Sequence, residues 1–60
     1  MNTFVQLSPI IMAVREGDLR YVKELLAAEP ELIDRVDSFG RNLLTYAVQY
    51  QQLNILRYLL

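Results

Sequence analysis

The feature that most restricts the fold of this chain is an internal repeat with a period of 34 residues. A shift by this period aligns SPIIMAVREGDL, residues 8–19, with NLLTYAVQYQQL, residues 42–53. Between residues 9–26 and 43–60 the two copies share five identities in eighteen positions, and the matched positions are mostly apolar. Repeats of this length are typical of proteins in which small structural units stack side by side. Neither copy carries a catalytic pattern, which favours contact with another protein over chemistry.

Within each copy the apolar residues recur at the spacing of an α-helix, at i, i+3, i+4 and i+7. Two short amphipathic helices are therefore expected in each copy, so the sequence predicts an all-α fold of two helical hairpins. The positions are Ile10, Ala13, Val14 and Gly17, then Leu19, Val22, Leu25 and Leu26; in the second copy they are Leu44, Ala47 and Val48, then Leu53, Leu56, Leu59 and Leu60.

Residues that begin and end helices stand where these hairpins need them. Ser8 can act as an N-cap with Pro9 at the first helical position, where its missing N–H costs nothing. Asn42 can cap the second copy in the same way. Gly17 lies between the paired helices, where a left-handed residue is usually needed. Its counterpart Gln51 lacks that freedom, so we expect the second turn to be strained or differently shaped.

The linker between the copies carries turn signals. The second helix of the first copy should end at about Ala28, because Pro30 disfavours helical geometry in the residue before it. Leu32 and Ile33 are then expected to pack as apolar plugs against the hairpin. The segment Asp37–Gly40 fits a type I turn, with Asp first and Gly fourth, and such a turn would project as a finger.

With these residues the chain resembles the ankyrin repeat family, whose pattern D-x-x-G-x-T-P-L-H-x-A is followed by a second helix ending in paired leucines. The resemblance covers residues 7–60 and implies ankyrin-like helical hairpins, a fragment of an α-solenoid, with a β-turn finger loop between them. The matching residues are Ser8, Pro9, Ile10, Ala13, Gly17, Leu19, Leu25 and Leu26 in the earlier copy, and Asp37, Gly40, Leu44, Ala47, Leu53, Leu59 and Leu60 in the later one.

The chain also departs from the family pattern. Ile11 and Thr45 stand where the family often has His, although Thr45 can still bond back to Asn42. The segment 28–30 replaces the Gly that usually follows the second helix. We expect one domain over residues 1–60, with repeat 1 at about 7–36 and repeat 2 at about 37–60.

The number of repeats has a consequence for stability. About three repeats are normally needed for a stable array, and this chain supplies roughly two. An apolar edge is therefore expected where a third repeat would stack, formed by Val48, Leu56, Leu59 and Leu60. Three interpretations stay open: further repeats of a longer chain, a homodimer formed through this edge, or a marginal fold.

Composition excludes several classes of function. The chain has no Cys and no His, so disulfides and Cys/His zinc sites are excluded. Its net charge of −1 provides no broad basic surface for nucleic acid or anionic lipid. The N-terminal segment lacks the basic start of a signal peptide, and no run of about 20 apolar residues exists to span a membrane. We expect no cofactor and a cytoplasmic chain, with secretion by another route left open.

The family resemblance implies a non-catalytic protein–protein interaction module, with partner contacts on the finger and on the exposed side of each first helix. On the finger these positions are Ser38, Phe39 and Arg41, on the later helix Gln49 and Tyr50, and in the earlier copy Leu7, Arg15 and Glu16. Phe, Tyr and Arg are enriched among binding hot spots. The alternatives are that Phe39 tucks under the finger and that Tyr50 merely edges the core.

Three other clusters of polar or aromatic residues could indicate a function, and each has a simpler interpretation. The carboxylates Glu29, Glu31, Asp34 and Asp37 could form an acid/base pair or a calcium site, but their spacing matches no calcium loop, and solvated loop charge is the simpler reading. The tyrosines Tyr21, Tyr46, Tyr50 and Tyr58 could stack on bases, but no basic groove accompanies them. The basic cluster of Arg15, Arg20 and Lys23 could indicate a helix-turn-helix DNA binder; interleaved acids, with Arg20 pairing to Glu24, explain it better.

Overall fold

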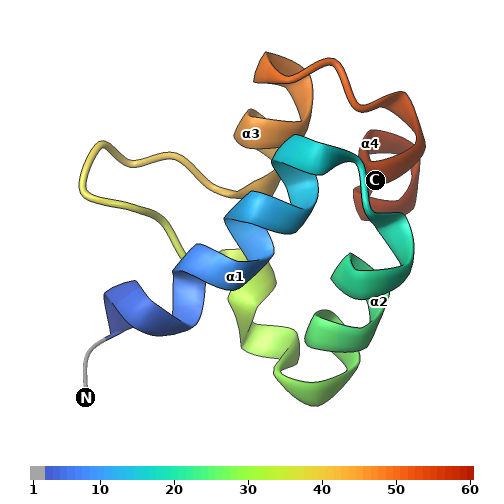
Figure 1. Cartoon of the computed structure of the whole chain (residues 1–60). Helices are drawn as coiled ribbons and strands as arrows, with labels where there is room; N and C mark the ends of the chain where they lie inside the picture. The colour runs from blue at the N-terminus through green and yellow to red at the C-terminus, as the bar shows by residue number, and fades with distance from the viewer. Residues whose placement is uncertain (1–2) are drawn as a thin grey trace.

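The computed structural model of the 60-residue chain describes the backbone from residue 3 onward and the side chains from residue 9 onward. Its helices α1 and α2 form a first hairpin and α3 and α4 a second, and residues 3–60 contain no strand (Figure 1). The predicted all-α fold of two helical hairpins is confirmed. The elements are α1 (Thr3–Glu16), α2 (Leu19–Ala28), the 3₁₀ helix η1 (Pro30–Asp34), α3 (Leu43–Gln49) and α4 (Leu53–Leu59).

The two hairpins stack side by side. Helix α1 packs against α3, and α2 packs against α4, so each helix meets its counterpart in the other hairpin. Helix η1 folds back on the end of α2. The loop of residues 35–42, yellow in Figure 1, extends away from the helices before α3 begins.

The turns inside the hairpins follow the 34-residue period at the level of the backbone. Gly17 has φ = 75° and its counterpart Gln51 has φ = 57°, so both adopt the left-handed conformation. In each turn the next N–H bonds back to the first helix: Asp18 to the Ala13 carbonyl and Gln52 to the Ala47 carbonyl, both at 2.9 Å. The second turn therefore keeps the shape of the first, and Gln51 accepts a conformation that costs an L-residue about 1 kcal/mol.

Polar side chains begin two of the helices. The Asn42 Oδ1 atom accepts bonds from the backbone N–H and the hydroxyl of Thr45, each at 2.9 Å, which confirms the predicted cap and the Thr45 contact. Asp18 caps α2 by accepting the N–H of Tyr21 at 3.1 Å. Helix α2 ends at Ala28, as the position of Pro30 predicted.

The expected N-cap at residue 8 is wrong, and of the two expected plugs only Leu32 is confirmed. Helix α1 begins at Thr3 and runs through Pro9, so residue 8 lies inside the helix instead of capping it. Proline removes a single helical N–H, and the turns on both sides of it can stay helical. In η1, Leu32 is 2% exposed but Ile33 is 41% exposed. A 3₁₀ helix has three residues per turn, so neighbouring side chains point about 120° apart and only one of the two can reach the hairpin.

The core is a seam between the two hairpins, called here the inner seam. The first hairpin contributes four side chains that its apolar spacing predicted, and the second contributes three that lie on the other side of its own helices. These residues are Ile10, Val14, Val22 and Leu26 from α1 and α2, and Leu43, Tyr46 and Ile55 from α3 and α4, all at most 8% exposed. Ala13 and Ala47 are also buried, and their small side chains allow the close approach of the helices.

Candidate protein-binding surface

The finger, residues 37–41, is held in shape by Asp37. The Gly40 N–H donates to the Asp37 carbonyl at 3.0 Å, which closes the predicted turn. The Asp37 Oδ1 atom accepts the N–H groups of Phe39 at 2.8 Å and Arg41 at 2.9 Å. Its other carboxylate oxygen accepts the hydroxyl of Tyr46 from α3. The finger is therefore tied both to itself and to the first helix of the second hairpin.

These hydrogen bonds shift the pKa values of Asp37 and Tyr46. The hydrogen bond from the Tyr46 hydroxyl, with those from the backbone N–H groups of Arg41 and Phe39, lowers the pKa of Asp37 below 3.8. The same bond, with partial burial, raises the pKa of Tyr46 above 10.0. At neutral pH Asp37 is therefore ionised and Tyr46 protonated, the combination in which this hydrogen bond forms.

Four side chains form a continuous row from the finger onto α3. The Arg41 guanidinium carbon lies 5.0 Å from the ring centre of Phe39 and 5.8 Å from that of Tyr46. The Tyr46 ring stacks on Tyr50, with centres 6.1 Å apart and planes inclined by 13°. Cation–π contacts of this geometry are worth about 0.5–1 kcal/mol at exposed sites. We call Phe39, Arg41, Tyr46 and Tyr50 the arginine–aromatic row.

Exposure decides between the two interpretations of Phe39 and of Tyr50. Phe39 is 76% exposed and lies on the outside of the finger, so the expectation that it tucks underneath is wrong. Tyr50 is half-buried and packs on the core cluster, so it edges the core as one interpretation predicted. The row thus has one end in solvent and the other anchored in the core.

The other predicted contact residues are exposed on the finger and at the ends of α1 and α3. Ser38 is exposed on the finger, and Gln49 is exposed at the end of α3. Arg15 and Glu16 are exposed at the end of α1, which packs beside α3. Arg15 occupies the same position in its hairpin as Gln49 in the next. The side chain of Leu7 lies outside the described residues.

The sequence missed the parts of the site that support it. Asp37 was expected only to start a turn, and its bond to Tyr46 depends on how the finger folds back onto α3. For Tyr46 the sequence suggests only a possible base-stacking role. In the structure Tyr46 is 8% exposed, and its ring makes a cation–π contact with the guanidinium of Arg41. The one feature of the sequence that could have indicated this hydrogen bond is an aspartate nine residues before a tyrosine.

The competing clusters have ordinary roles. Among the described residues no three acidic side chains gather closely enough to hold a metal ion, so the calcium reading of the linker finds no support. Arg20 pairs with Glu24 at 3.7 Å on the exposed face of α2, as predicted. The four tyrosines do not form one surface, because Tyr46 is buried whereas Tyr21 and Tyr58 are exposed on different hairpins.

The face of the second hairpin that points away from the inner seam is apolar and open. Val14 and Val48 are equivalent in the repeat, yet Val14 is 0% exposed and Val48 is 58% exposed. The second hairpin covers the first valine, and nothing in the described chain covers the second. The outer face consists of Leu44, Val48, Leu56 and Leu60, the counterparts of the four residues that the first hairpin places in the inner seam. Of the residues expected on this edge, Val48 and Leu60 are exposed, as predicted, whereas Leu56 and Leu59 are half-buried against the core.

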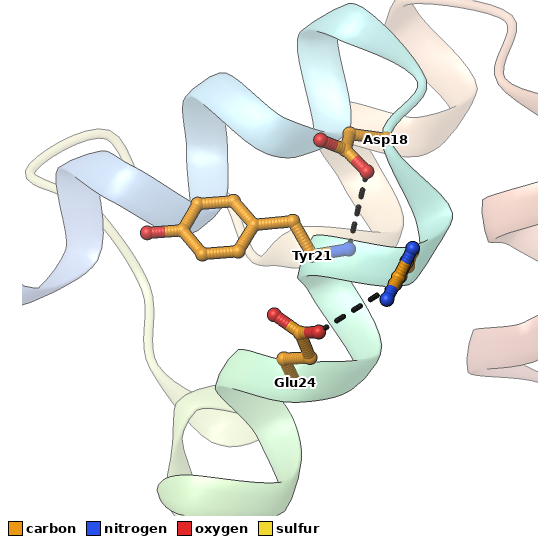
Figure 2. Close-up of polar contacts among 4 residues, drawn as sticks. Asp18, Tyr21 and Glu24 are labelled. Carbon is orange, nitrogen blue, oxygen red and sulfur yellow. Dashed lines mark hydrogen bonds and ion pairs between the residues drawn. The ribbon is translucent and has the colours of Figure 1, made fainter.

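No described residue covers the opposite side of the first hairpin, and the sequence did not predict this second uncovered face. Pro9, Met12 and Tyr21 are the counterparts of Leu43, Tyr46 and Ile55. Met12 is 50% exposed and Tyr21 is 42% exposed, whereas their counterparts are buried. Together with Ala13, Glu16 and Asp18 they line a shallow hollow of about 230 Å³. Figure 2 shows the Tyr21 ring extending from α2 toward α1 beside the Asp18 cap. We call Pro9, Met12 and Tyr21 the hollow face.

The fold and this surface define a protein of the helical-repeat class. Among the described residues, no helix combines the length and the apolar character needed to cross a membrane. The family model for ankyrin repeats, described as three copies, matches residues 1–60. The chain therefore belongs to the ankyrin repeat family, as the resemblance predicted. Searches of curated proteins and of solved structures found no significant match. Ankyrin repeats are generally protein–protein interaction modules and are typically not catalytic.

Proposed function

We propose that this chain binds a partner protein through the finger and the exposed sides of α1 and α3. The observation that carries this proposal is the arginine–aromatic row, in which the Arg41 guanidinium lies close to two rings and the finger is closed by Asp37. The contact surface would comprise Ser38, Phe39, Arg41, Gln49, Tyr50, Arg15 and Glu16.

Preorganisation is the physical reason that this row suits binding. An exposed arginine on a mobile loop loses about 0.5–1.5 kcal/mol of side-chain freedom when a partner immobilises it. Here the rings of Phe39 and Tyr46 already restrict the guanidinium, and the Asp37 bonds already restrict the loop. Binding energy from the exposed Phe39 ring is then less offset by ordering. Aromatic and Arg side chains of this kind carry most of the energy of many interfaces.

The test compares what the chain captures with and without the row. Wild-type chain, Phe39→Ala, Arg41→Ala and the control Ile33→Ala are immobilised and exposed to lysate of the source cells, and retained proteins are quantified by mass spectrometry. Ile33 is a matched control because it is 41% exposed and lies on η1, outside the proposed surface. We expect a protein that wild type and Ile33→Ala retain and that both row variants lose by about tenfold or more. Equal capture by all four chains would contradict the proposal.

Self-association is a second candidate function, supported by a different observation. Leu44, Val48 and Leu60 on the outer face are exposed and Leu56 is half-buried, although the equivalent residues of the first hairpin are buried. A repeat buries its apolar sides only against neighbours. A homodimer through this face would remove it from water without using the finger.

A further inference from the structure

We propose that copies of this chain associate head to tail, with the outer face of one copy packed on the hollow face of the next. This arrangement is one particular form of the self-association proposed above and rests on it. The contact would reproduce, between two chains, the inner seam that already joins the two hairpins inside one chain.

The apolar residues support this pairing position by position. Inside the chain, the four seam residues of α1 and α2 lie in one buried cluster with Leu43, Tyr46 and Ile55. One period further on, the outer face of one copy would meet Pro9, Met12 and Tyr21 of the next. The flexible, exposed Met12 and the hollow of about 230 Å³ beside it can receive branched side chains such as Val48. In the contact between copies, Glu16 would stand where Tyr50 stands inside the chain. Because Tyr50 is only half-buried there, the Glu16 carboxylate would stay in contact with water.

Charge at the second helices supports the same register. In the inner seam the Lys23 ammonium of α2 lies 5.3 Å from the ring centre of Tyr58 on α4. The counterpart of Lys23 is Arg57, and the counterpart of Tyr58 is Glu24. Within one chain, Lys23 of the first hairpin lies against the Tyr58 ring of the second hairpin. Between two copies, Arg57 of one copy would lie against the Glu24 carboxylate of the next. Both residues are exposed in the single chain, and Glu24 has only a 3.7 Å contact with Arg20.

The polar contact at the hairpin turns also has a matching counterpart. The Gln52 amide donates to the Arg15 carbonyl at 2.8 Å, and its side chain passes over Gly17. A Cβ on Gly17 would lie 2.7 Å from Gln52 Oε1, so a side chain at this position would displace the end of the Gln52 side chain. Between two copies, Gln51 of one copy would stand where Gly17 stands inside the chain. The shorter Asp18 of the next copy would stand where Gln52 stands. The Gln51 amide can then donate to the Asp18 carboxylate, with the long side chain now on the other partner.

These pairings predict an open-ended contact instead of a closed twofold dimer. A face that binds a different face of the next copy leaves one free face at each end of any assembly. A dimer made by two outer faces would use neither Met12 nor Glu24. The two arrangements therefore differ in what mutation of the hollow face should do.

The experiment is sedimentation of the 60-residue chain over a concentration series up to about 1 mM. Val48→Glu blocks the outer face and Met12→Glu blocks the hollow face; both positions are at least half exposed, so the single chain should tolerate the charge. We expect wild type and the control Ile33→Glu to form species that grow with concentration. Each blocked variant alone should stay monomeric, with association weakened at least about 100-fold by the buried charge. An equimolar mixture of the two should form a discrete 1:1 dimer, because it combines one intact outer face with one intact hollow face.

A charge exchange tests the register independently of the apolar faces. Arg57→Glu and Glu24→Arg should each weaken association by about fivefold, and the double variant should recover it. Dimers of Met12→Glu alone, with no complementation by Val48→Glu, would overturn the head-to-tail arrangement and leave self-association through two outer faces. A wild-type chain that stays monomeric over the whole series would overturn both. Circular dichroism of every variant must show the helix content of wild type.

Discussion

Val14 and Val48 offer a matched pair that tests how the two hairpins pack. They are the same residue at equivalent positions of α1 and α3, and only the stacking of the hairpins distinguishes their surroundings. Val14 is 0% exposed and Val48 is 58% exposed. Substitution of each by Ala removes the same atoms and brings the same gain in helix propensity, about 0.5 kcal/mol. The difference between the two variants therefore isolates burial.

The expected magnitudes follow from these exposures. Two methylene-sized groups are worth about 1.6 kcal/mol when fully buried, and the cavity left behind adds about 1 kcal/mol. After the gain in propensity, Val14→Ala should lower the free energy of unfolding by about 2 kcal/mol. At Val48 less than half of the transfer energy applies and no cavity forms, so the loss of about 0.7 kcal/mol is offset by propensity. Val48→Ala should lie within about 0.5 kcal/mol of wild type.

The assay is urea unfolding followed by circular dichroism at low micromolar protein, with the free energy extrapolated linearly to water. A loss of about 2 kcal/mol is a large share of the stability of a 60-residue domain, so it is easily measured. Equal losses for the two variants would refute the packing described here. If copies stack head to tail, the cost of Val48→Ala should rise with protein concentration while that of Val14→Ala stays constant.

Two further predictions concern the second turn and the finger. Gln51→Gly should raise the free energy of unfolding by about 0.5–1 kcal/mol, because it relieves a left-handed residue at φ = 57°; a loss of stability in urea unfolding would contradict this. Asp37 should titrate below 3.8 in the folded chain, as read from its carboxyl carbon by NMR, and its pKa should rise in Tyr46→Phe. Because its folded pKa is lowered, its contribution to stability is present above the unfolded pKa and is lost as the pH falls through the folded value. The raised pKa of Tyr46 sets the opposite limit, since its contribution is present below about 10 and is lost above the folded value. An unchanged Asp37 titration in Tyr46→Phe would show that the bond is not formed in solution.

The sequence predicted those parts of the fold that depend on local chemistry. The Asn42 cap, the left-handed Gly17, the end of α2 before Pro30 and the turn at Asp37 each follow from the backbone preferences of one or two residues. At Gln51 the sequence left open a strained or a differently shaped turn, and the structure shows the strained one, with φ = 57°. Local signals therefore gave the number of helices and most of their ends.

The sequence predicted only in part which apolar side chains are buried, because burial depends on what stacks against each face. The repeat argument predicted that Val48 lies exposed on an open edge, but it also placed Leu59 there, and Leu59 is half-buried against the core. Leu43 and Ile55 fall outside the predicted stripe, yet they are at most 1% exposed because they face the first hairpin from the other side. The sequence did not predict the hollow face for the same reason. Whether its residues are buried or exposed depends on which structural element packs against them.

The candidate binding site was predicted in part. Phe39, Arg41 and Tyr50 were identified from the family pattern, and the structure joins them into one row through Tyr46. The connection between the finger and α3 depends on a hydrogen bond between Asp37 and Tyr46, nine positions apart, that no local rule predicts. Glu16, a predicted contact residue, also lines the hollow beside Met12.

The most direct test concerns the packing of α1 on α3, because this contact defines how the hairpins stack, buries Val14 and leaves Val48 exposed. Nuclear Overhauser effects between methyl groups would measure it in solution. We expect cross-peaks that join the Ile10 or Val14 methyls to those of Leu43 or Ala47, since all four side chains lie in one buried cluster. A folded, helical chain in which no such cross-peak links α1 to α3 would show that the hairpins do not stack.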